Sequence, residues 1–196
     1  MTDYGADTAL IVVDVQNDFA DPAGSLSVSR AAHVLPRINA EVADARAAGS
    51  LVFYTQDWHP PSTPHFEKDG GIWPVHCVAD TWGAELHPDL KVDGEIVRKG
   101  ANGEDGYSGF TMRDPVSGAE VATPLEAMLH ERGVERVVVC GLATDYCVNA
   151  TALDARRLGF ETVVLRRAVA AVNLKPGDEE RALEAMASAG AEVQEG

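Results

Sequence analysis

Three side chains with catalytic chemistry lie where apolar segments of the sequence end. Asp14 follows a first apolar run, Lys99 closes a second short segment, and Cys147 comes soon after a third. A thiol can act as a nucleophile, a nearby carboxylate can take its proton, and a buried ammonium favours both anionic forms. Taken one at a time, each residue has a structural alternative. Asp14 could anchor a loop, Lys99 could be a solvated cation, and Cys147 could be packed in the core.

Cys147 lies in the first turn of a helix that is predicted to begin near Thr144. The unpaired N–H groups at such a helix start lower a thiol pKa and can hold an oxyanion. In an arbitrary helix, however, packing as a small apolar side chain is the more common role of a cysteine. Cys140, inside an apolar strand, and Cys77 are interpreted as structural.

Histidines gather in the segment 57–93, which is rich in Pro, Gly and Trp and has no clear period. Its candidate metal ligands are Asp57, His59, His65 and His76. Such oxygen and nitrogen donors suit zinc, iron or manganese, and residues i and i+2 of an extended segment share a face. A chance gathering of histidines is an equal alternative at this point. His33 and His130, on predicted helices, are interpreted as structural.

The rest of the chain alternates between predicted strands and helices. Strands are predicted at residues 8–13, 51–55, 95–98, 136–140, 161–165 and 191–194, and helices at 30–48, 124–130, 144–158 and 178–189, with a glycine-rich loop at 101–117. This alternation predicts an α/β fold, a three-layer αβα sandwich with a mostly parallel central sheet. We expect a single domain over residues 1–196, with 57–93 as a metal-binding loop insertion. Ligands of such sheets bind beyond the carboxyl ends of the strands.

Composition narrows the class of partner. The 196 residues include 16 Lys and Arg against 31 Asp and Glu, a net charge of −15. An acidic surface repels phosphate backbones and anionic lipid, so we expect no nucleic-acid and no membrane partner. The sequence has no apolar run long enough to span a bilayer and no visible signal peptide. Three cysteines are too few for a disulfide framework, and a cytoplasmic location is expected.

Five motifs together make the chain similar to a known family. They are IVVDVQNDF (11–19), DWHP and the following histidine (57–65), WPVHC (73–77), RKG with YSGF (98–110) and GLATDYCV (141–148). In this order and spacing they resemble the nicotinamidase/pyrazinamidase group of the isochorismatase-like cysteine hydrolases. The resemblance runs from about residue 8 to the last predicted helix.

The resemblance implies catalytic roles for the three residues named first. Cys147 corresponds to the nucleophile, Asp14 to the carboxylate that handles the proton, and Lys99 to the third member of the triad. The Leu142–Ala143 bond corresponds to a non-proline cis peptide, which directs the N–H groups of Ala143 and Cys147 into an oxyanion hole.

The resemblance also implies a metal, a substrate and a reaction. Asp57, His59, His65 and His76 match ligands of one divalent metal ion, zinc first, with iron and manganese as alternatives. Phe19, Trp73, Tyr107 and Leu142 match residues around the substrate. The expected reaction converts nicotinamide to nicotinate and ammonia through a thioester, with pyrazinamide as a further substrate. The metal is expected to orient the substrate ring. The sequence leaves the assembly of the chain open, with a homo-oligomer as one alternative.

Other functions remain open on the sequence alone. An amidohydrolase acting on a carbamoyl or ureido compound, or on another small amide, would keep the triad without needing the histidines. An isochorismatase proper generally lacks the cysteine. A metal–water hydrolase would use the histidine set directly, and a non-catalytic metal-dependent scaffold would have no reason to keep all three triad residues.

Overall fold

The centre of the structure, a computed structural model that describes residues 2–195, is a six-stranded parallel sheet in the order β3-β2-β1-β6-β7-β8. Its strands are β1 (Thr8–Val13), β2 (Leu51–Asp57), β3 (Glu95–Lys99), β6 (Arg136–Leu142), β7 (Glu161–Ala170) and β8 (Glu192–Gln194). The helices are α1 (Asn17–Ala20), α2 (Ala31–Ala47), α3 (Leu125–Glu131), α4 (Asn149–Arg157) and α5 (Asp178–Ser188). Outside the sheet lie a hairpin of β4 (Thr111–Arg113) and β5 (Glu120–Ala122), two 3₁₀ turns (Glu67–Asp69 and Trp82–Ala84) and a π-helical turn (Thr144–Val148).

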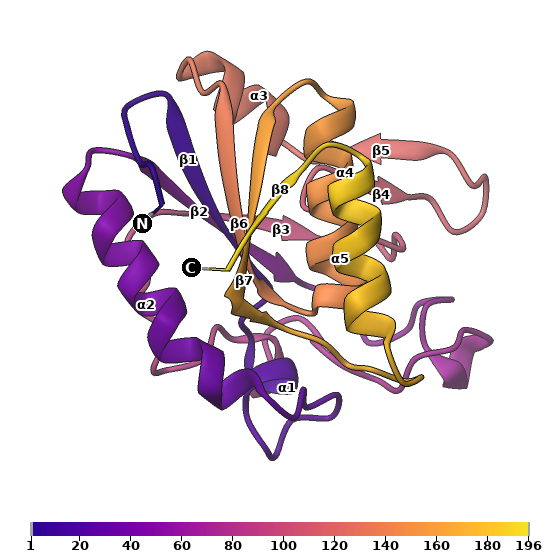
Figure 1. Cartoon of the computed structure of the whole chain (residues 1–196). Helices are drawn as coiled ribbons and strands as arrows, with labels where there is room; N and C mark the ends of the chain where they lie inside the picture. Colours follow the sequence, from indigo (N-terminus) through magenta and orange to yellow (C-terminus); the bar gives the residue numbers. More distant parts are fainter. Residues whose placement is uncertain (1, 196) are drawn as a thin grey trace.

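Helices cover both faces of this sheet, as Figure 1 shows with α2 on one side and α4 and α5 on the other. Every residue of β1 is buried, and its side chains alternate between two apolar clusters. Leu10 and Val12 pack in the cluster that includes Ile38 of α2, whereas Ile11 packs in the one that includes Met186 of α5. A strand that is covered on both faces needs a continuous apolar run. The predicted three-layer α/β fold is confirmed.

Several details of the structure differ from the sequence prediction, among them the absence of α1 (Asn17–Ala20) from the predicted helices. The region 101–117, predicted to be a loop throughout, contains β4. The sequence did not predict this hairpin, because strands of three residues carry little periodic signal and β5 has no buried residue. Strand β7 continues to Ala170, beyond the predicted end at residue 165. The prediction stopped short because the exposed Arg166 and Arg167 interrupt the apolar pattern of the strand. The segment predicted as one helix from Thr144 begins with the π-helical turn, and α4 follows it.

The order of the strands brings the candidate residues to one edge. β1 lies between β2 and β6, and β3 lies beside β2. Asp14 follows β1, while Asp57 and Lys99 are the last residues of β2 and β3 and pair in register. Because parallel strands end at the same edge, side chains from segments far apart in the chain meet there.

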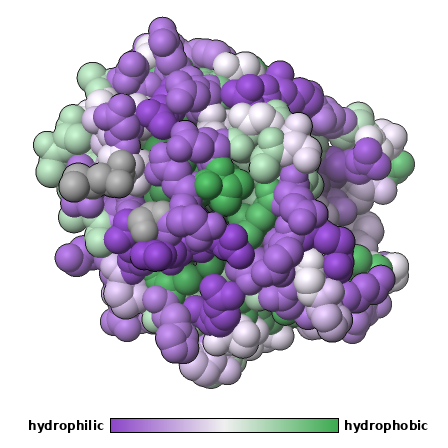
Figure 2. All heavy atoms as spheres, viewed as in Figure 1, coloured by the Kyte–Doolittle hydropathy of each residue, from purple (hydrophilic) through white to green (hydrophobic). Residues whose placement is uncertain are grey.

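The face seen in Figure 2 is mostly hydrophilic, with apolar side chains gathered near its middle between α2 and α5. This agrees with the excess of 31 acidic over 16 basic residues. None of the helices within residues 2–195 combines the length and apolar character that crossing a bilayer requires.

Candidate active site

Asp14, Lys99 and Cys147 meet at the carboxyl edge of the sheet. The Lys99 Nζ lies 2.9 Å from Asp14 Oδ2 and 3.8 Å from the Cys147 Sγ. The exposed fractions are 0% for Asp14, 1% for Lys99 and 8% for Cys147. The three residues proposed from the sequence as a catalytic triad therefore form one buried cluster.

Thr55 on β2 fixes the carboxylate of Asp14. Its hydroxyl donates to Asp14 Oδ1 at 2.6 Å and accepts the Asp14 N–H at 3.2 Å. Asp14 itself has a φ of 48°, a left-handed conformation that turns the chain sharply at the end of β1. Sequence reasoning missed Thr55, because a threonine inside an apolar strand carries no signal that distinguishes it from a packing residue.

Lys99 is shared between two carboxylates. Besides Asp14, its ammonium donates to Asp57 Oδ1 at 2.5 Å and to the Gly106 carbonyl at 2.8 Å. Burial alone would lower the pKa of Lys99, but the charges of Asp14 and Asp57 raise it well above its usual value. Burial likewise opposes ionisation of Asp57, and the charge of Lys99 more than offsets it, so the pKa of Asp57 is lowered. Lys99 is therefore a permanent cation in the site.

The thiol and the carboxylate beside it are both shifted toward their neutral forms. Burial raises the pKa of Cys147 well above its usual value, and the Lys99 charge only partly opposes this. Burial also raises the pKa of Asp14, again against the charge of Lys99. The resting thiol is therefore protonated at neutral pH, and a nucleophilic sulfur requires that its proton moves to a neighbouring base.

The chain around Cys147 turns tightly at the end of β6. The Leu142–Ala143 peptide bond is cis, as the sequence resemblance implied. The Ala143 carbonyl then accepts the N–H groups of Tyr146 and Val148 within the π-helical turn. Leu142, Ala143 and Cys147 all line the same pocket, so the turn presents sulfur and backbone together.

Three of the four proposed metal ligands form a second cluster. One ring nitrogen from each of His59, His65 and His76 lies within 4.8 Å of the others. Asp57 Oδ2 lies 3.8 Å from the His59 Nε2, which places the fourth proposed ligand beside them. His87 lies apart from this cluster, with its Nε2 3.8 Å from Asp21.

The histidine cluster fits a divalent metal ion. Both ring nitrogens of the buried His59 have no hydrogen-bond partner among residues 2–195, and a coordinating cation would satisfy one of them. Burial lowers the pKa of His76 to about 4, so its imidazole is neutral at pH 7, the form that binds metals. Its Nδ1 lies 2.7 Å from the Pro74 carbonyl, which leaves Nε2 as the coordinating atom.

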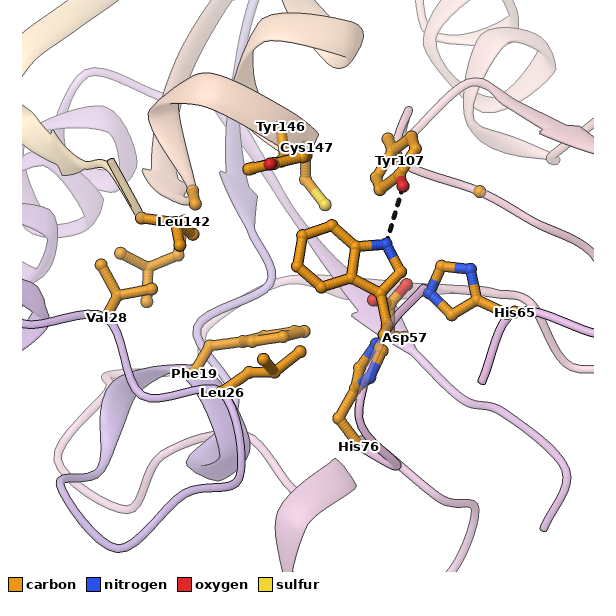
Figure 3. A pocket seen from close by; sticks show the side chains of 14 residues that line it. Phe19, Leu26, Val28, Asp57, His65, His76, Tyr107, Leu142, Tyr146 and Cys147 are labelled. Carbon is orange, nitrogen blue, oxygen red and sulfur yellow. Dashed lines mark hydrogen bonds between the residues drawn. The ribbon is translucent and has the colours of Figure 1, made fainter. Parts of the chain in front are cut away.

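Cys147 of the first cluster lines the same pocket as Asp57, His65 and His76. Figure 3 shows the Cys147 sulfur pointing into it, with His65 and His76 on one side and Leu142 and Val28 on the other. The four residues proposed to contact the substrate all line it, and the indole N–H of Trp73 donates to the Tyr107 hydroxyl at 2.8 Å. Five further lining residues that sequence reasoning missed are Leu26, Val28, Gly106, Tyr146 and Val172.

Comparison with known proteins identifies the family of this chain. The model of the Isochorismatase domain matches residues 8–196. The chain belongs to the isochorismatase family. Its relatives include the nicotinamidase/pyrazinamidase of Mycobacterium tuberculosis, 43% identical over 80% of this chain and 83% of that protein.

Two solved structures in this family share the fold over nearly the full length. The pyrazinamidase of Pyrococcus horikoshii in complex with zinc matches with a TM-score of 0.85 and 44% identity over 96% of this chain and 98% of that one. The PnC1 protein of L. infantum in complex with nicotinate matches with a TM-score of 0.88 and 36% identity, covering 98% of this chain and 95% of that one.

Proposed function

We propose that this isochorismatase-family protein is a nicotinamidase, an amidohydrolase that converts nicotinamide to nicotinate and ammonia and also accepts pyrazinamide. The observation that carries the proposal is that the Cys147 sulfur and the histidine cluster border one pocket with aromatic walls. An aromatic ring with a polar nitrogen on one side and a carboxamide on another suits such a site. The relatives named nicotinamidase and pyrazinamidase support the same substrate class.

The first half of the proposed reaction forms a thioester. Asp14 takes the thiol proton, and the Cys147 sulfur attacks the carboxamide carbon. The N–H groups of Ala143 and Cys147 hold the negative charge that develops on the carbonyl oxygen, and each such donor contributes about 3 kcal/mol. Asp14 then returns the proton to the departing nitrogen, the C–N bond breaks, and ammonia leaves.

The second half releases the acid. Asp14 takes a proton from a water molecule, whose oxygen attacks the thioester carbon. The C–S bond breaks, the sulfur regains a proton from Asp14, and the carboxylic acid loses its own proton to solvent and leaves as nicotinate. Lys99 stays protonated throughout, because the two carboxylates beside it hold it in the charged form.

A metal ion would orient the substrate in this scheme. Asp57, His59, His65 and His76 would hold it, with zinc as the first candidate because a solved relative is a complex with zinc. When bound, the ion would offer a coordination position to the pyridine nitrogen, so that the carboxamide lies over the sulfur. The nucleophile in this proposal is the sulfur and not a metal-bound water.

Removal of the sulfur tests the proposal. We expect Cys147→Ala to abolish ammonia release from nicotinamide while its metal content stays near that of the wild type. Cys140→Ala is the matched control, because Cys140 is an equally buried thiol in the cluster that packs against α2. It should lose some stability and keep its activity. If Cys147→Ala keeps most of its activity and chelation abolishes it, the reaction is that of a metal–water hydrolase.

A further inference from the structure

Asp105 lies against the histidine cluster but belongs to a different loop from all the proposed ligands. Its Oδ1 is 2.6 Å from the Nδ1 of His65, whose side chain is 6% exposed. We propose that Asp105 is a positioning residue of the metal site, which fixes the ring of His65 so that its other nitrogen faces the metal ion. The inference rests on the proposed metal site and adds to it a residue outside the ligand set.

The backbone of Asp105 is held firmly enough for this role. Its N–H donates to the Arg113 carbonyl at 2.8 Å, and its own carbonyl accepts the Arg113 N–H at 2.6 Å. This pair of bonds ties the loop to β4, the strand that pairs with β5. The carboxylate is therefore presented to His65 from a fixed part of the chain.

The ring of His65 has little freedom on its other sides. It stacks on His59 with ring centroids 4.9 Å apart and an angle of 24°, and the ring of Tyr107 lies edge-on at 6.2 Å. With Nδ1 facing the carboxylate of Asp105, Nε2 is the nitrogen left for coordination. His76 is arranged in the same way, with Nδ1 beside the Pro74 carbonyl. In this arrangement both rings would turn Nε2 toward the metal ion, with Nδ1 placed beside an oxygen atom from outside the ligand set.

Asp105 differs from the carbonyl of Pro74 because it carries charge. An acceptor behind a coordinating imidazole fixes the tautomer and makes the ring a stronger ligand, and its loss typically lowers metal affinity about 10–100-fold. The side chain of Asp105 is 43% exposed, so water screens part of its charge. We therefore expect orientation of the ring to account for more of the effect than charge does.

The experiment measures zinc binding by the full chain. Metal-free wild type, Asp105→Asn and Asp105→Ala are titrated with Zn²⁺ against a chromophoric chelator, and the absorption spectrum of each protein with Co²⁺ is recorded. Asp114→Asn is the matched control, since Asp114 adjoins the same strand but its carboxylate accepts from Val116 and Ser117 in an exposed turn. Asp105→Ala should raise the Kd for Zn²⁺ about 10–100-fold and change the Co²⁺ spectrum. Asp105→Asn should raise it less, because its amide oxygen can still lie beside Nδ1, and the control should match the wild type.

Two further variants separate failure of this inference from failure of the proposed site. If wild type binds Zn²⁺ and His59→Ala does not, yet both folded Asp105 variants bind within threefold of wild type, Asp105 has no positioning role and the ligand set stands. If His59→Ala and His65→Ala bind as tightly as wild type, the ligand set is wrong and the role of Asp105 is overturned with it. Thermal melting of the metal-free proteins identifies any variant that fails to fold. For such a variant, Asp105→Glu must restore Zn²⁺ affinity at least partly, or the inference is overturned.

Discussion

Lys99 dominates the electrostatics of the site because one buried ammonium balances two buried carboxylates. Its Nζ lies 2.9 Å from Asp14 and 2.5 Å from Asp57, and both acids are at most 4% exposed. Buried charges are stable only when paired. Lys99 thus joins the proposed catalytic residues to the proposed metal site as well as facing the sulfur.

Loss of this ammonium should be costly for stability. Lys99→Met keeps the apolar stem but leaves two carboxylates facing each other, so we expect the free energy of unfolding to fall by about 3–5 kcal/mol. The exposed Lys91 provides the matched control. Lys91→Met should change the free energy of unfolding by less than about 0.5 kcal/mol. Urea unfolding measures both. Equal stability of the two variants would show that Lys99 does not hold the carboxylates together.

In the proposed reaction, the raised pKa of Asp14 should set the acid side of the pH profile. Asp14 must be ionised to take the thiol proton, and burial shifts its pKa upward. Activity is therefore lost as the pH falls through a value above about 4, the ordinary range of an aspartate. We expect kcat/KM for nicotinamide to rise with pH through that shifted pKa, with metal content checked at each point. Full activity at pH 4 in metal-loaded protein would contradict the assignment of Asp14 as the base.

Among the elements, the close approach of β6 and β1 positions the turn that carries Cys147. Gly141 has a φ of 112°, and a Cβ there would lie 2.2 Å from the Val13 carbonyl oxygen, directly before Asp14. Glycine is thus required both for the backbone conformation and for the contact between the strands. The two residues that follow Gly141 line the pocket.

An alanine at this position should disturb stability and site together. Gly133→Ala is the matched control, because Gly133 has a φ of 68° and open space around it, and should cost about 1–2 kcal/mol. Gly141→Ala adds the clash with β1, so its cost should be about 2–5 kcal/mol, with a large loss of activity. Thermal unfolding and ammonia release measure both variants. The account of this contact is wrong if the two variants lose the same stability and both stay fully active.

The elements also show what the sequence could and could not predict. Apolar runs that are buried on both faces predict β1 and its neighbours, and the acids and the lysine at their ends follow from the parallel arrangement. Partners that meet only through the fold have no local signal, which is why Thr55 and Asp105 were missed. The hairpin β4–β5 was missed as well, because its short strands have almost no buried face.

At the scale of the whole molecule, the net charge of −15 acts differently on substrate and product. Nicotinamide is neutral, whereas nicotinate is an anion that the acidic field disfavours. Salt screens this field, with a Debye length of about 10 Å at 0.1 M. The acidic surface should therefore favour release of the product.

Product inhibition at two salt concentrations tests this effect. We expect the inhibition constant of nicotinate to decrease severalfold between about 0.01 M and about 0.3 M NaCl, while the KM for nicotinamide changes little. Benzamide, a neutral aromatic amide of similar size, is the control ligand, and its inhibition constant should not change with the salt concentration. An inhibition constant of nicotinate that increases with salt would mean that local cations, and not the overall charge, govern product binding.

In the proposed reaction the Cys147 sulfur bonds covalently to the acyl carbon of the substrate. Rapid acid quenching of wild type mixed with nicotinamide, followed by digestion and mass spectrometry, tests it most directly. We expect a peptide that contains Cys147 and is heavier by one nicotinoyl group, with no such gain in mass on the peptide that contains Cys140. Ammonia release through the first turnover with no adduct on Cys147 at any time would contradict it.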